Sequence, residues 1–306
     1  MQRPRAALSP AHRLVPMSSG GFSVSERALA RVGSAVGKYQ LTCLLGVGGT
    51  AVVYAATHRN GHRVAIKFLL EHLADDPEFC RSFRREAQVV NQVGHPGAVP
   101  VLDDDVDERG CPFLIMPLLE GETVRARWER DGKRMAVGAA GQLMSDVLDV
   151  LTCAHANGIV HRDIKPDNLF ITAAGRVHVL DFGIARRAEE DGGTVSAQVI
   201  GTPAFMAPEQ AIGDPNAVGP HSDIWAVGAT IFSLLSGEFV HRTDGSRGQL
   251  AAAATRHARS LAEANPELPP AVVQFVDKAL AFEPSDRWRS AREMRDAMNR
   301  CLRRRF

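Results

Sequence analysis

The chain has 306 residues, enough for one or two folding units around a large core, and its 45% hydrophobic and 23% charged residues are those of an ordinary globular protein. Its net charge of +1 excludes a bulk electrostatic attraction to nucleic acid or to a membrane surface, so we expect neither partner. The five cysteines are scattered and odd in number, which excludes complete internal pairing and favours reduced thiols in the cytoplasm.

No segment predicts a secretory signal or a membrane span. The basic N-terminus, residues 1–21, is interrupted by prolines and lacks the continuous apolar run of a signal peptide. The longest strongly apolar run, residues 224–235, is too short for a bilayer and predicts a buried helix instead. We expect residues 1–37 to be a leader with little order, apart from a short helix near residues 25–32.

The sequence after the leader predicts a small unit built mainly from strands. Residues 39–69 alternate apolar and turn-forming residues, as three antiparallel strands do, and the Asn-Gly pair at 60–61 indicates a hairpin between the second and third. Two further strands are expected near residues 99–105 and 112–118. The acidic run at 103–108 most simply caps a turn, and a metal-binding role is the less favoured alternative.

One main helix is expected inside this unit. Asp76 is a suitable N-cap, and Pro77 suits the first helical position. Apolar residues then recur at helical spacing and define one buried stripe, formed by Phe79, Phe83, Ala87 and Val90. Glu86 falls on the edge of this stripe, so its carboxylate is expected to face inward.

Beyond residue 121 the pattern becomes mainly helical. A helix is expected to end at Asn157 and Gly158, a good C-cap pair, after an apolar stripe formed by Leu143, Val147, Leu151 and Ala154. Residues 177–183 predict a short strand. The fold class is therefore α+β, with a small antiparallel sheet and one main helix beside a larger, mostly helical part.

The octapeptide HRDIKPDN at residues 161–168, with DFG at 181–183, carries the groups that phosphoryl transfer requires. Asp163 can accept the proton of an attacking hydroxyl, and Lys165 can neutralise charge on the phosphoryl group. Asn168 and Asp181 offer oxygen ligands, which Mg²⁺ prefers. A base, two metal-holding groups and a nearby cation together indicate a phosphotransferase.

Four more motifs follow the same family order: LGVGGTAVVY at 45–54, VAIK at 64–67, GTPAFMAPE at 201–209 and SDIWAVG at 222–228. With these motifs the chain resembles the eukaryotic-type (Hanks-type) protein kinases and is most similar to the bacterial serine/threonine kinases. The resemblance covers residues 38–301. It implies a bilobal fold with an N-lobe at 38–119, a C-lobe at 120–301 and a basic tail at 302–306.

The glycine-rich stretch reads G-x-G-x-x-A, with Ala51 where the family usually has glycine. A dinucleotide-binding fingerprint would be followed by a helix, whereas residues 52–57 predict a strand. The resemblance therefore implies a flap whose backbone covers the phosphates. A plain hairpin turn is the alternative. The nucleotide contacts that the resemblance implies are Leu45, Gly46, Gly48, Gly49, Val53, Ala65, Lys67, Glu86, Met116, Pro117, Leu119, Asn168 and Asp181.

Lys67, by resemblance, holds the α- and β-phosphates and is oriented by Glu86. An exposed charge is the alternative for each residue.

In the expected hinge Met116 would lie behind the adenine, and the backbone of Pro117 and Leu119 would meet its edge. Pro117 lacks an N–H donor but keeps its carbonyl acceptor. An ordinary buried strand is the alternative here.

The resemblance also implies scaffolding residues. His161 is expected to pack beneath the metal loop and not to act as a base. Glu209 and Arg287 are expected to form a buried ion pair. Asp223 is expected to hydrogen-bond the backbone of the catalytic loop.

We therefore expect an ATP-dependent protein serine/threonine kinase that uses Mg²⁺, with Mn²⁺ as an alternative ion. Lys165 and Thr202 favour acceptors of the serine/threonine class. Two alternatives remain open: a pseudokinase that acts as a binding module, and a small-molecule phosphotransferase on a related fold. Regulation is expected through trans-autophosphorylation of Thr194, Ser196 or both in a transient homodimer, with Arg162, aided by Arg186 or Arg187, binding the phosphate. Plain loop hydroxyls are the alternative for Thr194 and Ser196.

Overall fold

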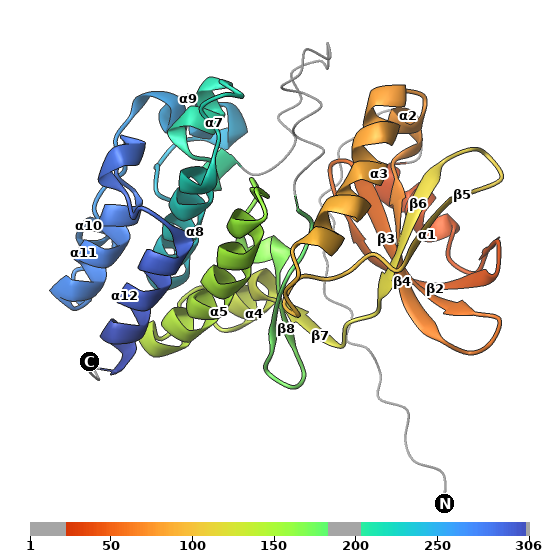
Figure 1. The fold of residues 1–306 in the computed structure, drawn as a ribbon, viewed down its shortest axis with the longest axis horizontal. Helices are drawn as coiled ribbons and strands as arrows, with labels where there is room; N and C mark the ends of the chain where they lie inside the picture. Colours follow the sequence, from red (N-terminus) through yellow and green to blue (C-terminus); the bar gives the residue numbers. More distant parts are fainter. Residues whose placement is uncertain (1–22, 183–202, 304–306) are drawn as a thin grey trace, which may run out of the picture.

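The structure is a computed structural model that describes residues 23–182 and 203–303, and these residues form two lobes joined near residue 118 (Figure 1). The small lobe combines an antiparallel sheet with helices on its surface. Its elements are α1 (Val24–Ala30), β1 (Ala35–Val36), β2 (Tyr39–Val47), β3 (Ala51–His58), β4 (Arg63–Leu69), α2 (Glu71–Ala74), α3 (Pro77–Gln92), β5 (Asp103–Val106) and β6 (Pro112–Pro117).

The sheet of the small lobe has the order β1-β2-β3-β4-β6-β5, with every neighbouring pair antiparallel. The three strands expected between residues 39 and 69 are confirmed as β2, β3 and β4. Gly61 in the expected β3–β4 hairpin has φ 90°, where glycine is favoured. Lys67 pairs with Val53 of β3 and with Leu114 of β6, so it lies on an inner strand.

Residues 23–37 are ordered, which corrects the expected extent of the leader. Ser23 and Glu26 form a capping box at the start of α1, so the short helix expected near residues 25–32 is present. The Tyr54 hydroxyl of β3 donates a 2.9 Å hydrogen bond to the Ala28 carbonyl. Because β1 also pairs with β2, the packed small lobe includes residues that lie well before residue 38.

The acidic run at 103–108 has two roles in the small lobe. Asp103–Val106 form the exposed edge strand β5, a few residues later than the strand expected at 99–105. Asp107 Oδ1 accepts hydrogen bonds from the backbone N–H groups of Arg109 and Cys111, and so caps the following turn as expected. Among the described residues no cluster of three metal-ligating side chains occurs, here or elsewhere.

The helix α3 begins and packs as its sequence predicts. Asp76 accepts a hydrogen bond from the Glu78 backbone N–H, and Pro77 is the first helical residue. The buried face of α3 includes the expected stripe together with Glu86: Phe79, Phe83, Glu86, Ala87 and Val90.

The large lobe is mainly helical, and a three-stranded sheet of order β7-β8-β9 lies at its junction with the small lobe. Its elements are β7 (Gly121–Thr123), α4 (Val124–Arg130), α5 (Val137–Ala156), η1 (Pro166–Asn168), β8 (Leu169–Thr172), β9 (Val177–Val179), η2 (Pro203–Phe205), α7 (Pro208–Ile212), α8 (Pro220–Ser236), α9 (Gly245–Thr255), α10 (Leu261–Ala264), α11 (Pro270–Ala279), η3 (Pro284–Asp286) and α12 (Ala291–Arg303).

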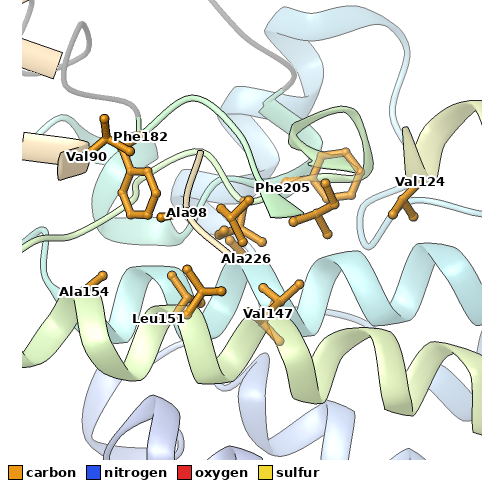
Figure 2. Packing of buried hydrophobic residues seen from close by; sticks show 14 of the residues in the cluster. Val90, Ala98, Val124, Val147, Leu151, Ala154, Phe182, Phe205 and Ala226 are labelled. Carbon is orange, nitrogen blue, oxygen red and sulfur yellow. The ribbon is translucent and has the colours of Figure 1, made fainter. Parts of the chain in front are cut away.

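The helices α5 and α8 form the centre of the large lobe. Every residue of α8 from Ser222 to Ser236 is buried, which confirms the buried helix predicted at 224–235. Side chains of α5 and α8 share one apolar cluster with Phe182, from the segment that follows β9 (Figure 2). The active-site loops are thus fixed to the rigid centre of the lobe. No helix within the described ranges is both long and apolar enough to cross a membrane.

Candidate active site

The ammonium of Lys67 lies between two carboxylates from distant parts of the chain. Lys67 is on β4, Glu86 is on α3, and Asp181 follows β9. Lys67 Nζ is 2.8 Å from Glu86 Oε1 and 2.7 Å from Asp181 Oδ1. Lys67 and Glu86 are buried, so neither is the exposed charge of the alternative reading, whereas the Asp181 side chain is 46% exposed.

The Lys67 ammonium stabilises the charge of both carboxylates in this triad, whereas the two carboxylates repel each other. Burial by itself would lower the pKa of Lys67, but the carboxylates of Asp181 and Glu86 outweigh burial and raise it. Burial raises the pKa of Glu86, and the Lys67 ammonium opposes this rise. Partial burial of Asp181 would raise its pKa, but the Lys67 ammonium outweighs this effect and lowers the pKa. Lys67 is therefore charged at neutral pH.

Asp163, Lys165 and Asn168 form a second hydrogen-bonded group, in the loop after α5. Lys165 Nζ lies 2.7 Å from Asp163 Oδ2. The Asn168 side-chain amide donates to the same oxygen and to the Asp163 backbone carbonyl, each at 2.8 Å. These bonds fix the orientation of the Asp163 carboxylate, as a general base requires before its substrate arrives.

Asp223 at the start of α8 holds the backbone of the same loop, as expected. Its two carboxylate oxygens accept the backbone N–H groups of His161 at 2.9 Å and of Arg162 at 2.7 Å. His155 of α5 adds a contact of 2.8 Å, and these bonds outweigh burial to lower the pKa of Asp223. Arg162 has φ 68°, which L-residues rarely adopt, so this anchoring stabilises a strained backbone next to Asp163.

His161 has the structural role expected of it. Its Nε2 lies 2.9 Å from the Leu180 carbonyl, and its ring centroid is 4.6 Å from that of Phe182. Burial lowers the pKa of His161, so the ring is neutral at pH 7 and unsuited to carry the proton of a reaction. The contact positions Asp181, which has φ 49° and is aimed at Lys67 by its unusual backbone conformation.

Asn168 and Asp181 fit the divalent ion that the sequence implies. The Asn168 amide nitrogen is occupied by Asp163, and its amide oxygen has no partner within the described residues. Asp181 adds a carboxylate that keeps its charge, because its pKa is lowered. Mg²⁺ is commonly held by one or two protein oxygens together with the phosphates of the substrate, and this donor set matches that pattern.

The glycine-rich residues form the hairpin between β2 and β3, with Leu45, Gly46, Gly48 and Gly49 all exposed. The Gly48 N–H donates 2.8 Å to the Ala51 carbonyl and closes the turn. A Cβ at Gly46 would meet no atom within 4 Å, so the open flap does not itself require glycine there. Ala51 is buried at the start of β3, on the side of the turn that packs on the sheet.

The expected hinge residues lie at the end of β6 and just after it. Met116 pairs with Ala65 of β4, and Pro117 pairs with Val64. Met116, Pro117 and Leu119 are half-buried at the junction of the lobes, whereas the preceding residues of β6 are buried. The strand thus leaves the core where adenine contacts are expected, and these contacts stay a prediction.

Several residues named from the sequence fall outside the described residues: the regulatory sites Thr194 and Ser196, the arginines at 186 and 187, and Thr202. Their placement is not part of the site as described.

Gln210 of α7 belongs to the site but was missed by sequence reasoning. Its amide donates 2.9 Å to the Arg162 carbonyl, which ties α7 to the catalytic loop. The only sequence signal at Gln210 is its position as the third residue of α7, and glutamine at that position indicates a helix cap and not a contact with the catalytic loop.

The expected ion pair between Glu209 and Arg287 is present and buried. Arg287 Nη1 and Nη2 lie 2.8 Å and 2.9 Å from the Glu209 carboxylate oxygens. The remaining guanidinium donors reach backbone carbonyls, so all five N–H groups are used. Arg287 thereby fixes α7, and with it Gln210, to the C-terminal part of the lobe.

Comparison with known proteins agrees with this geometry. The model of the protein kinase domain family matches residues 39–299. The chain belongs to this family. Pkn1, a serine/threonine-protein kinase of Myxococcus xanthus, is 38% identical over 277 residues, covering 89% of this chain and 39% of Pkn1. PknA of Mycobacterium tuberculosis is 34% identical over 267 residues, covering 86% of this chain and 61% of PknA.

Solved kinase structures share the fold. The PknI kinase domain of Mycobacterium tuberculosis superposes with a TM-score of 0.67 at 27% identity, covering 88% of this chain and 98% of that domain. The chain spans less than two thirds of the length of Pkn1 and PknA. The comparison therefore extends to the kinase domain of such proteins, and the two lobes described above are its N-lobe and C-lobe.

Proposed function

We propose that this kinase domain transfers the γ-phosphoryl group of ATP to serine and threonine hydroxyls of proteins. The observation that carries the proposal is the joint presence of the Lys67 triad and the Asp163 group at the junction of the lobes. One supplies a fixed cation for the phosphates, and the other supplies an oriented carboxylate for the acceptor hydroxyl. Positioning and charge neutralisation of this kind account for most of the catalysis in phosphoryl transfer.

In this proposal the acceptor hydroxyl donates its proton toward Asp163. Lys165, 2.7 Å from Asp163 Oδ2, balances the negative charge that the carboxylate and the phosphoryl oxygens bring together. Lys67 binds the phosphates that remain, and Glu86 keeps its ammonium in place. Asn168 and Asp181 would hold Mg²⁺, or Mn²⁺ in its place, and the ion would supply neutralisation of the phosphate charge.

Two observations favour a protein acceptor over a small molecule. The segment from Pro203 to Glu209 is anchored by the Arg287 pair, and Gln210 ties it to the catalytic loop. A fixed segment beside the base is what an extended polypeptide needs to be seated. The named relatives are serine/threonine-protein kinases, and Lys165 beside Asp163 supports the same acceptor class.

The pseudokinase alternative has less support, because all four residues are present, with Lys67 bonded to Asp181 and Asn168 bonded to Asp163. The deciding experiment is incubation of the purified domain with labelled Mg-ATP and a mixture of protein and small-molecule acceptors. We expect label on serine and threonine of protein substrates and negligible label on tyrosine. Label confined to small molecules, or ATP binding without any transfer, would refute the proposal.

The proposed function also includes a cellular location and a mode of regulation. We infer a cytoplasmic enzyme whose activity rises when Thr194, Ser196 or both are phosphorylated by a second copy in a transient homodimer. A phosphate adds charge of about −1.5 to −2 and strong acceptor oxygens that an arginine can grip. Phosphatase treatment should lower activity, and full activity in the double Thr194→Ala, Ser196→Ala variant would exclude this switch.

A further inference from the structure

A basic cluster lies where α8 gives way to α9, apart from the catalytic residues. Residues 238–259 contain four arginines and two carboxylates, an excess of two positive charges with the histidines neutral. Arg242 and Arg256 are exposed, and the side chain of Arg256 has no hydrogen bond or ion pair to any described residue. Exposed arginines in excess of their carboxylates attract anions from solution.

Arg259 forms the inner part of this cluster, and its side chain is only 13% exposed. Its Nε donates 3.1 Å to the Val240 carbonyl, and its Nη2 donates 2.9 Å to the Phe239 carbonyl and pairs with Glu238. The guanidinium also lies over the Phe232 ring, 5.0 Å from its centroid. These contacts fix the cation in one position next to the start of the α8–α9 loop.

Three buried polar atoms in this neighbourhood lack a hydrogen-bond partner in the described part of the chain: His241 Nε2, Thr243 Oγ1 and Arg259 Nη1. Buried polar groups nearly always find partners, so each of these atoms needs a reason. Burial lowers the pKa of His241, and the approach of Arg256 and Arg259 lowers it further. An unpaired polar group close to fixed cations, as His241 is, has the composition of an anion-binding site.

The cluster adjoins the segment that seats the acceptor. Phe239 packs edge-on against Phe205 of η2, with ring centroids 5.8 Å apart. The helix α9 lies beside α7 and η2 (Figure 1). Through Gln210 of α7 these elements reach the Arg162 carbonyl, one residue from Asp163. A polypeptide held at Asp163 can therefore extend along η2 and α7 toward the cluster.

We propose that His241, Thr243, Arg256 and Arg259 bind an acidic or phosphorylated side chain of the protein substrate, several residues from the acceptor hydroxyl. The proposal rests on the proposed kinase function and adds an anionic substrate class to it. Carboxylate and phosphate share the oxyanion that these groups recognise. Arg256 would contact the anion first, and the unpaired atoms would form further hydrogen bonds with the anion.

The first test measures kcat/KM for threonine peptides in which one glutamate, or one phosphoserine, is moved along the sequence, each against its glutamine counterpart. We expect the anionic peptide to be favoured about tenfold at one stretch of positions, the size of one charge-assisted hydrogen bond. Arg256→Glu should remove this preference, and Arg300→Glu, at an exposed position of α12, should keep it. Equal kcat/KM for all peptides, or a preference unchanged in Arg256→Glu, would overturn the proposal.

The second test uses Thr243→Val, which removes the unpaired hydroxyl and keeps the shape of the side chain. Removing an unsatisfied group should not lower Tm, and yet the preference for the anionic peptide should fall. A preference that survives in this variant contradicts the role of Thr243. If the anionic and glutamine peptides are phosphorylated equally well, the anion-binding role of the cluster is rejected and the kinase function stands. If no peptide is phosphorylated, the proposed kinase function is rejected as well. Anisotropy of a labelled peptide reports binding without ATP.

Discussion

Glu86 of α3 and Lys67 of β4 form a buried ion pair, with 2.8 Å between Oε1 and Nζ. The pair joins the only long helix described in the small lobe to an inner strand of its sheet. The attraction acts away from water, where breaking a pair leaves a buried charge without compensation. The position of α3 on the sheet therefore determines where the Lys67 ammonium points, and so whether it can reach the phosphates in the proposed reaction.

The first prediction concerns this pair. Glu86→Gln removes the charge of the side chain and keeps its size, so the Lys67 ammonium should turn toward Asp181 and away from the position expected for the phosphates. We expect the KM for ATP to rise about tenfold and kcat to fall, with Lys67→Met losing orders of magnitude in kcat/KM. Steady-state kinetics at varied ATP will measure both. A Glu86→Gln enzyme with wild-type kcat and KM would show that the pair has no orienting role.

The second prediction separates the two aspartates. Asp163→Asn should cut turnover by orders of magnitude while Mg-ATP affinity stays near wild type, because Asp163 orients the acceptor. Asp181→Ala should weaken Mg-ATP binding, because it removes a proposed metal ligand and one partner of Lys67. Calorimetric titration and single-turnover kinetics distinguish the two effects. Unchanged Mg-ATP affinity in folded Asp181→Ala protein would remove Asp181 from the metal site.

The third prediction concerns the departure at Ala51. Ala51 is buried and pairs with Leu69 at the start of β3, so it lies on the sheet side of the flap. Ala51→Gly loosens the backbone there. We expect the KM for ATP to change by less than about tenfold, or roughly 1.4 kcal/mol. The measurement is KM at saturating peptide, and complete loss of activity would place the flap elsewhere.

Much of the catalytic site could be predicted from short patterns. The Asp76 cap and the stripe of α3 determine which way Glu86 faces, and local helix rules are enough to show this. The buried apolar run of α8 was equally clear. These features depend on neighbours within a few residues, which a sequence displays directly.

Other features could not be predicted, because they depend on contacts between distant segments. His155 gives no local signal for its bond to Asp223, 68 residues away. The helix α1 belongs to the small lobe because Tyr54 and Asp107 bind it, while its own composition suggested a weakly ordered leader. Unpaired atoms such as Thr243 Oγ1 are likewise invisible until the surrounding side chains are placed.

The fourth prediction links stability to pH through Glu209. Burial would raise its pKa, but the hydrogen bonds and charge of Arg287 outweigh burial and lower it. A depressed folded-state pKa means that the stabilisation is complete above the ordinary glutamate value of 4.5 and is lost as pH falls through the folded-state value. Urea unfolding from pH 7 down to pH 3 will follow this loss.

Substitution tests the same pair at neutral pH. Glu209→Ala should cost about 3–5 kcal/mol, because it leaves the Arg287 cation buried without its partner. The matched control is Glu71→Ala, which breaks an exposed pair with Arg109 and should cost no more than about 1 kcal/mol. Equal losses in the two variants would contradict the role assigned to the buried pair.

The last prediction concerns the attachment of α1. Arg31, at the end of this helix, lies 2.6 Å from Asp107 and 4.0 Å from the centroid of the Phe68 ring, and Phe68 directly follows Lys67. Arg31→Ala should therefore destabilise the domain by about 1–2 kcal/mol, combining a partly exposed ion pair with a cation–π contact. At about 2–4 °C per kcal/mol this is a measurable fall in Tm. Arg27→Ala, on the exposed side of the same helix, is the control and should leave Tm unchanged. Equal Tm values for the two variants would mean that the attachment of α1 does not stabilise the small lobe.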